Sequence, residues 1–254
     1  MVMNPQTPSD HNILFNRSQE ILSDLYQKID DRLALQPQPV HQPFQSFASP
    51  DGSFTGSLQT LIGTNIDWLI HSSINVPSRA FGTMRLTAWL EPYIQVPHLA
   101  FEFGLFSSQL LFYIDYIPRV DLWTHPEYVE QYYKPVEPTY LQLRDHPNLT
   151  LFVSKGFYVR QVQSPTHLCF TCPTTNDSFS LLQAVAHEMC DRWLDWVEQA
   201  SPVAIEKQAD LAKRDRQMRQ ITAERDPGNA MVEKSLGAEI AGQIVRSLWD
   251  KTVN

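Results

Sequence analysis

Hydrophobic and polar residues alternate along several short segments in the first two thirds of the chain. A period of two residues, combined with many β-branched and aromatic side chains, is typical of β-strands. Short polar turns separate these segments from one another. We therefore predict strands at Ser53–Leu61, Ile66–Ile74, Phe81–Leu90, His98–Phe106, Gln109–Tyr116, Leu149–Val153, Phe157–Gln163 and His167–Cys172.

Other segments carry apolar residues at helical spacing. Predicted helices are Ile13–Leu35, Glu127–Leu143 with interruptions at Pro135 and Pro138, Phe179–Gln199, Ala204–Glu224 and Met231–Lys251. The proline-rich stretch Gln36–Pro50 is predicted to be a loop. Strands grouped together, with helices mostly flanking them, indicate an α+β fold: one antiparallel sheet with helices packed on it. Residues 1–12 are expected to be a flexible tail, and residues 13–254 a single domain.

Composition narrows the class of protein. The 254 residues carry a net charge of −8, which argues against general nucleic-acid binding. No apolar run reaches the ~20 residues of a membrane span, so we expect a soluble protein. The beginning of the chain has neither the basic nor the apolar region of a secretory signal.

Known cofactor motifs do not occur in the sequence. The nine glycines form no phosphate-binding loop, so no bound nucleotide is predicted. The pair Cys169 and Cys172 has the spacing of a redox motif, but it lies on a predicted strand rather than at a helix N-terminus. Neither the cysteines nor the scattered histidines suggest a metal site. If the protein is an enzyme, a partner must supply any cofactor chemistry.

Two carboxylates are candidates for acid catalysis. Glu102 lies on a core strand, pointing away from its neighbours Phe101 and Phe103. Exposure to solvent is the more common arrangement for Glu, whereas in a cavity a protonated Glu could act as a general acid. Asp226 lies in the Arg-Asp-Pro-Gly segment between two predicted helices. Taken alone, it is better explained as a turn or cap residue.

Several cationic and hydroxyl side chains could bind anions. Arg160 could hold a substrate carboxylate through paired hydrogen bonds, or form a surface salt bridge; Ser164, in a nearby turn, could bind the same group. Lys213, Arg216 and Arg219 make one face of the helix Ala204–Glu224 basic. Such a face is usually only solvated, and the alternative is a docking patch for an acidic partner.

The order of these motifs resembles red chlorophyll catabolite reductase, a relative of the ferredoxin-dependent bilin reductases. The resemblance runs from about Gly56 to the C-terminus. It rests on Gly56-Ser57-Leu58, Ile66-Asp67-Trp68, Phe101-Glu102, the segment Ile114–Leu122, Pro126-Glu127-Tyr128, Tyr132-Tyr133, Phe157–Arg160, Ser164–Thr166, Arg214-Asp215, Asp226 and the closing helix.

This resemblance implies a three-layer α/β/α sandwich and ferredoxin-dependent, two-electron reduction of a linear tetrapyrrole, with no bound metal or flavin. The expected substrate is red chlorophyll catabolite. The matching carboxylates Glu102 and Asp226 become candidate proton donors to a substrate radical, and Lys213, Arg216 and Arg219 a candidate ferredoxin site. Some bilin reductases carry a His near the position of Arg85. Its absence favours the chlorophyll-catabolite branch and makes Arg85 a candidate substrate-binding residue.

Alternatives to this function are reduction of a bilin such as biliverdin, and tetrapyrrole binding without catalysis. A carrier needs no proton donors, so the presence of Glu102 and Asp226 argues against the second. The start of the chain does not resemble a plastid transit peptide. The expected location is therefore the cytoplasm of a cyanobacterium-like host, or the plastid stroma if the sequence is that of a mature plant protein. A homodimer is left open.

Overall fold

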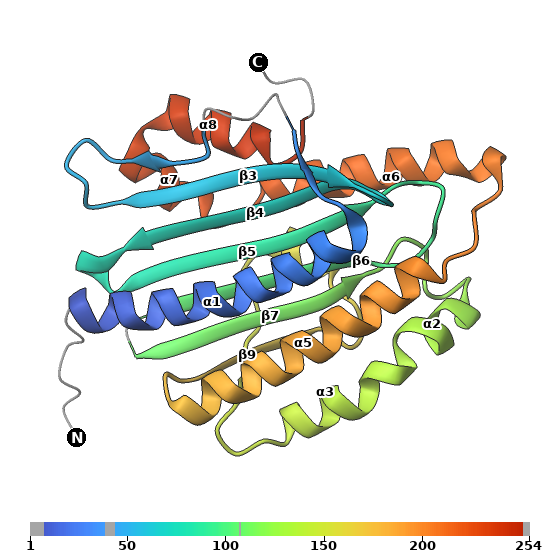
Figure 1. The fold of residues 1–254 in the computed structure, drawn as a ribbon, viewed down its shortest axis with the longest axis horizontal. Helices are drawn as coiled ribbons and strands as arrows, with labels where there is room; N and C mark the ends of the chain where they lie inside the picture. Colours follow the sequence, from blue (N-terminus) through green and yellow to red (C-terminus); the bar gives the residue numbers. More distant parts are fainter. Residues whose placement is uncertain (1–7, 39–43, 107, 251–254) are drawn as a thin grey trace.

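A single antiparallel sheet forms the middle of the protein (Figure 1). The computed structural model describes residues 8–38, 44–106 and 108–250. Within these residues the sheet contains β1 (Gln36–Pro37), β2 (Phe47–Ala48), β3 (Thr55–Gly63), β4 (Ile66–Val76), β5 (Phe81–Leu90), β6 (His98–Phe106), β7 (Gln109–Ile117), β8 (Thr150–Leu151) and β9 (Leu168–Pro173). The strand order is β1-β3-β4-β5-β6-β7-β9-β8, and β2 pairs with β3.

One face of the sheet is covered by the helices α1 (Pro8–Leu33) and α5 (Asn176–Glu198). Each presents apolar residues at helical spacing to the sheet. On α5, the Thr175 side chain accepts a hydrogen bond from the backbone N–H of Ser178 and caps the first turn. Three shorter helices, α2 (Pro126–Tyr132), η3 (Lys134–Val136) and α3 (Glu137–Arg144), contribute to the same core. The predicted interruptions at Pro135 and Pro138 are confirmed, because each proline lies in the first turn of a new helix.

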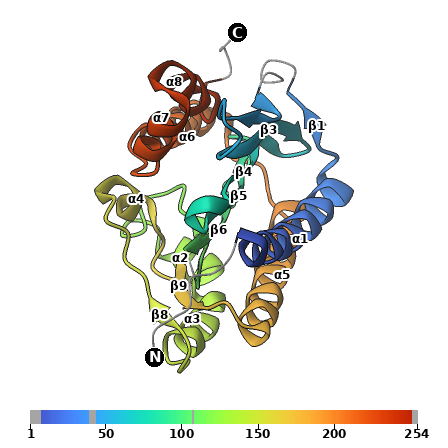
Figure 2. The same ribbon diagram turned by 90° about the vertical axis from the view of Figure 1, so that its left-hand side faces the viewer.

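The opposite face carries α4 (Phe157–Val162), α6 (Ile205–Glu224), α7 (Asn229–Leu236) and α8 (Ala238–Ser247). Figure 2 shows the sheet nearly edge-on, with these helices on one side and α1 and α5 on the other. A second, smaller apolar core fills the space between the sheet and α6–α8. The predicted three-layer α/β/α sandwich with a central antiparallel sheet is therefore confirmed.

Strand β6 shows how the sequence divides the two faces. Leu99, Phe101, Phe103 and Leu105 are fully buried in the core beneath α1 and α5. The alternate residues face α6–α8, and Glu102 is among them. The sequence therefore correctly predicts that Glu102 points away from the two phenylalanines.

Helix α6 is fixed to the sheet by a buried ionic network. The Arg119 guanidinium donates hydrogen bonds from Nε and Nη2 to Oδ2 of Asp215, at 3.1 and 2.6 Å. Nε2 of His98 lies 3.1 Å from the other carboxylate oxygen of Asp215. Because the Leu90 N–H donates to Nδ1 of His98, the proton of the neutral ring lies on Nε2, on the side of the ring nearer Asp215. Burial lowers the pKa of His98 to about 4, so this histidine is neutral at pH 7.

Two predicted elements differ from the structure. The segment predicted as strand Phe157–Gln163 forms α4 instead, with the Arg160 N–H bonded to the Gly156 carbonyl. Six residues are too few for periodicity to separate a strand from a helix, and the strand preference of Phe, Tyr and Val depends on having a neighbouring strand. Within the described residues the predicted helix Met231–Lys251 is two helices, because Gly237 adopts a φ of +85° between α7 and α8; Lys251 lies outside the described part of the chain.

Element boundaries also shift. Helix α1 begins at Pro8, so residues 8–12 of the predicted tail are helical, and the side chain of His11 is buried. Residues 1–7 lie outside the described part of the chain. The predicted loop Gln36–Pro50 contains the short strands β1 and β2, and its residues 39–43 are likewise not described.

Candidate active site

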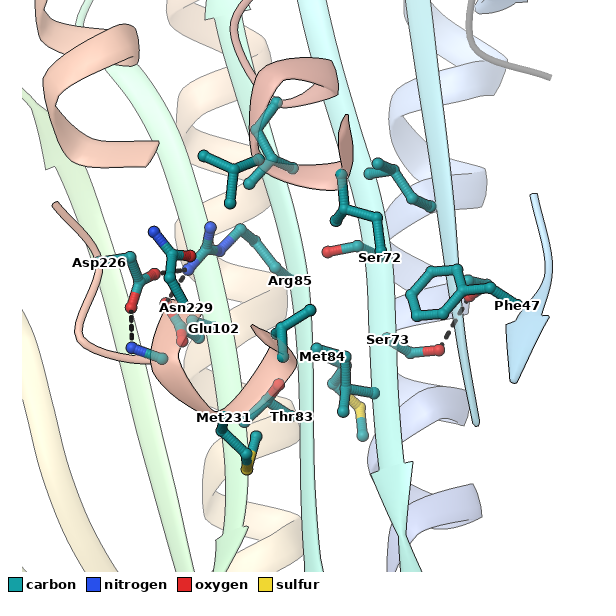
Figure 3. Close-up of a pocket in the computed structure, with 18 of the residues that line it drawn as sticks. Phe47, Ser72, Ser73, Thr83, Met84, Arg85, Glu102, Asp226, Asn229 and Met231 are labelled. Atoms are coloured by element: carbon teal, nitrogen blue, oxygen red, sulfur yellow. Dashed lines mark hydrogen bonds and ion pairs between the residues drawn. The ribbon is translucent and has the colours of Figure 1, made fainter. Parts of the chain in front are cut away.

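A pocket lies between the sheet and the helices α7 and α8 (Figure 3). Its floor is formed by residues of β3–β6, and its roof by residues of α7, α8 and the α6–α7 loop. The lining is largely apolar, including Met84, Met231, Val232 and Ile244. The cavity volume is about 120 Å³, whereas small-molecule sites typically enclose roughly 300–1,000 Å³. The pocket is therefore smaller than a typical small-molecule site.

Antiparallel register brings Arg85 and Glu102 together on the pocket floor. Arg85 on β5 is the direct cross-strand partner of Glu102 on β6. Side chains at such paired positions point to the same face, with Cβ atoms about 4.5–5.5 Å apart. Nη2 of Arg85 donates a hydrogen bond to Oε2 of Glu102 at 3.1 Å. The sheet thus supplies one acid and one cation at the same place.

Asp226 reaches the same guanidinium from the roof. It lies in the loop between α6 and α7, as predicted, where Pro227 and Gly228 separate the two helices. Its Oδ1 accepts a hydrogen bond from the Gly228 N–H at 2.8 Å, the turn role that the sequence suggested. Its Oδ2 accepts a hydrogen bond from Nη2 of Arg85 at 3.0 Å. Asp226 is therefore both a turn residue and a pocket residue.

One nitrogen atom of Arg85 bridges the two carboxylates. The side chains of Arg85, Glu102 and Asp226 are 25%, 35% and 27% exposed, so the cluster is partly shielded from water but not sealed. The negative charge of Glu102, followed by that of Asp226, raises the pKa of the Arg85 guanidinium. With both acids ionised, the cluster carries a net charge of −1.

A polar row continues across the sheet beyond Glu102. Tyr113 on β7 is the cross-strand partner of Glu102, and Cys169 on β9 is the partner of Tyr113. The Tyr113 hydroxyl donates to Oδ2 of Asp115, which is 1% exposed and also accepts the Ser164 N–H. Burial raises the pKa of Asp115. The pKa of Tyr113 is raised by burial and, to a smaller extent, by the neighbouring charge of Asp115.

The sequence does not predict Tyr113 or Asp115 as site residues. The available signal was the spacing of two polar residues on alternate positions of a strand, on the face opposite the apolar Phe112 and Ile114. The same pattern is typical of a strand that has one face exposed to solvent. Asp115 is buried and Tyr113 half-buried because helices and loops pack over this face.

Arg160 and Ser164, predicted to bind substrate, are not among the residues that line the pocket. Arg160 is exposed on α4, and its Nη1 donates to the Ser154 carbonyl at 2.7 Å. Ser164 is buried and binds the carboxylate of Asp115 through its N–H. In this conformation both residues have local structural roles. Of the three residues predicted to bind substrate, only Arg85 is a pocket residue.

The predicted docking residues on α6 divide into two groups. Lys213 and Arg216 are exposed, as a docking patch requires. Arg219 is 5% exposed, donates a hydrogen bond to Asp67 at 3.0 Å and lies over the ring of Trp68. Assigning Arg219 to a surface patch was wrong. It lies one helical turn from the buried Asp215 and so faces the sheet.

Thiol and metal chemistry receive little support from the described residues. Cys169 and Cys172 lie on β9, as predicted, and both are buried. Burial raises the pKa of Cys169 to about 12, which disfavours a reactive thiolate. In the described ranges, no group of three or more His, Cys, Asp or Glu side chains is arranged to hold a metal ion.

None of the described helices is long and apolar enough to span a bilayer.

Known proteins with similar sequences share one description. The family described as "Red chlorophyll catabolite reductase (RCC reductase)" matches residues 17–250. Red chlorophyll catabolite reductase of Hordeum vulgare is 27% identical over 197 residues, covering 72% of this chain and 96% of that protein. The chloroplastic Arabidopsis thaliana protein of the same name is 24% identical over 250 residues, covering 90% of this chain and 78% of its own length. These relatives come from plants, so the expected cyanobacterial host gains no support.

Among solved structures, the fold matches that of tomato phytochromobilin synthase, crystallised in complex with biliverdin. The TM-score is 0.79, with 93% of this chain and 83% of the other covered. At 16% identity this similarity concerns the fold alone. The resemblance read from the order of the motifs is confirmed by the family match. Because that match spans residues 17–250 of 254, the chain belongs to the red chlorophyll catabolite reductase family.

Proposed function

We propose that this protein reduces a linear tetrapyrrole, most specifically red chlorophyll catabolite, by two electrons taken one at a time from reduced ferredoxin. The observation that carries the proposal is the meeting of Glu102 and Asp226 at one pocket, from opposite layers of the fold. A flat pigment inserted between sheet and roof would have an acid on each side. The family match and the apolar pocket lining support the same substrate class.

The chemistry follows from the electron supply. Addition of one electron to the pigment gives a radical anion, which is more basic than the pigment and takes a proton from a nearby acid. A second electron and a second proton complete the addition of two hydrogen atoms across one double bond. Glu102 and Asp226 are the proposed donors, each regaining a proton from solvent. The pocket must limit water around the radical, which the packing of α7 and α8 over the sheet would favour.

Electron delivery is proposed to use the exposed part of α6. Lys213 and Arg216 offer positive charge on an otherwise acidic protein, which would steer an acidic ferredoxin. No tightly bound cofactor is required. The reaction would take place where ferredoxin is present. The proposed compartment is the plastid stroma, because the Arabidopsis thaliana relative is named as chloroplastic.

The test is anaerobic incubation with reduced ferredoxin and either red chlorophyll catabolite or biliverdin, followed by absorbance. Bleaching of red chlorophyll catabolite alone supports the proposal. Bleaching of biliverdin alone indicates a bilin reductase, and binding without bleaching indicates a carrier.

Replacing Asp226 by Asn tests the proton donor. D226N should still bind the pigment, because the amide keeps the size of the carboxyl group, but turnover should fall by about a hundredfold or more with loss of the acid. D210N, at an exposed position on α6, is the matched control and should keep wild-type turnover. Wild-type turnover in D226N would remove Asp226 from the mechanism.

A further inference from the structure

Arg85 donates hydrogen bonds from a single nitrogen atom to both proposed proton donors. A general acid must carry its proton, whereas a guanidinium within hydrogen-bond distance favours the carboxylate form. Nη2 of Arg85 lies 3.1 Å from Oε2 of Glu102 and 3.0 Å from Oδ2 of Asp226. Both acids share one donor atom, so displacement of Arg85 would release both at once.

An anionic group entering the pocket has one cation to bind. Among the described residues that line the pocket, Arg85 alone is positively charged. Hydroxyl groups of Ser72 and Thr83 lie on the same floor and can add hydrogen bonds. Linear tetrapyrroles carry carboxylic side chains, and a guanidinium is the side chain best suited to bind them. The long Arg85 side chain is partly exposed and can reach a new partner without moving its strand.

We propose that Arg85 exchanges Glu102 and Asp226 for a carboxylate of the bound pigment, and that the released acids take up a proton. This inference rests on the proposed function and names how the substrate prepares the site for catalysis. A pigment carboxylate would change the charge of the cluster from −1 to −2, and uptake of about one proton restores it. Oδ1 of Asp226 keeps its bond from the Gly228 N–H, so Oδ2, the oxygen that Arg85 leaves, is free to bind the proton.

Other ionisable groups face the same region and must be separated from this effect. Tyr113 and Asp115 on β7 and Cys169 on β9 lie on this face of the sheet, and burial raises the pKa of each. In the α6–α7 loop, Arg225 lies over the ring of Tyr158. The pocket residues contributed by α7 and α8 are uncharged.

The experiment measures proton uptake on binding of red chlorophyll catabolite, without ferredoxin, by calorimetry at pH 7 in buffers of different ionisation enthalpy. Wild-type protein should take up about one proton per pigment bound. The propionate methyl ester of the pigment should cause less than about a third of that uptake. Equal uptake with acid and ester, or none with the acid, would overturn the proposal. The ester comparison uses only wild-type protein, so it does not depend on the folding of a variant.

Variants then assign the effect to Arg85. R85Q should lose most of the uptake and at least about tenfold of the preference for the acid over the ester. R79Q removes an exposed arginine between β4 and β5 and should behave as wild type. Uptake in R85Q equal to that of R79Q would refute the role of Arg85.

Difference infrared spectroscopy locates the proton. A protonated carboxyl band should appear when the pigment binds, and it should be lost in E102Q or in D226N. A band that persists in both variants would place the proton on another group, such as Asp115, and overturn the assignment. Failure of the pigment to bind at all would count against the proposed function. Binding without proton uptake would count only against this inference.

Discussion

Replacing Asp215 by alanine is expected to lower the free energy of unfolding by about 3–5 kcal/mol, the usual cost of removing one partner of a buried ion pair. Asp215 is 7% exposed and Arg119 is 1% exposed. Once Asp215 is removed, Arg119 keeps only hydrogen bonds to three backbone carbonyl groups. Those carbonyls are neutral, so the guanidinium charge remains buried without a counter-ion. His98 also loses the carboxylate that lies 3.1 Å from its Nε2.

Urea denaturation followed by circular dichroism gives the unfolding free energy of each variant by linear extrapolation. D210A, on the exposed side of the same helix, controls for the change in helix composition and should stay within about 0.5 kcal/mol of wild type. A loss in D215A no larger than that of D210A would refute the reasoning. It would mean that water or another side chain compensates Arg119.

A double-mutant cycle adds a sharper test. R119M removes the buried charge, so D215A should cost less in the R119M background than in wild type, by about 1 kcal/mol or more. Strict additivity of the two changes would show that Arg119 and Asp215 do not depend on each other. The pairing inferred from their distances would then contribute nothing to stability.

Three further predictions concern pH, partner docking and the ion pair between Arg219 and Asp67. Burial lowers the pKa of His98 from 6.5 to about 4. Between these two pKa values the unfolded chain binds a proton at His98 and the folded protein does not. The free energy of unfolding should therefore fall by roughly 3 kcal/mol as the pH drops from 6.5 to about 4. H98Q should flatten the fall, and an unchanged slope would exclude His98 as its source. The double charge reversal K213E/R216E should weaken ferredoxin-supported activity most at low salt, without changing stability; no effect would move the docking site elsewhere. R219M should do the opposite, losing roughly 3 kcal/mol of stability with normal salt dependence, because it removes the buried cation of the Arg219–Asp67 ion pair.

The sequence and the structure agree most closely where local pattern and long-range packing impose the same requirement. The predicted positions of the five long strands are close to those observed. Helix α5 likewise matches its predicted apolar face, since one stripe of side chains must be buried whatever the partner. By contrast, the segment 157–163 has strand-like residues but no strand beside it, and it folds as α4.

The two faces of α6 show a second limit. Lys213, Arg216 and Arg219 all look like surface charges in a sequence rich in polar residues. Only the packing of α6 against β4 separates them, because Arg219 points at Asp67 while the other two point to water. A charged residue is rarely buried without an oppositely charged partner, and Asp67, the partner of Arg219, lies 152 positions away in the chain.

The candidate site shows the same division most clearly. The sequence alone determined that Glu102 points away from the aromatic core, that Asp226 sits in a break between helices, and which family the motifs resemble. The tertiary structure decided that these two acids meet, and that they meet across Arg85. Strand register sets which side chains are neighbours on a sheet, and helix packing sets what lies above them. A local sequence pattern determines neither the strand register nor the helix packing, because both depend on contacts between residues far apart in the chain.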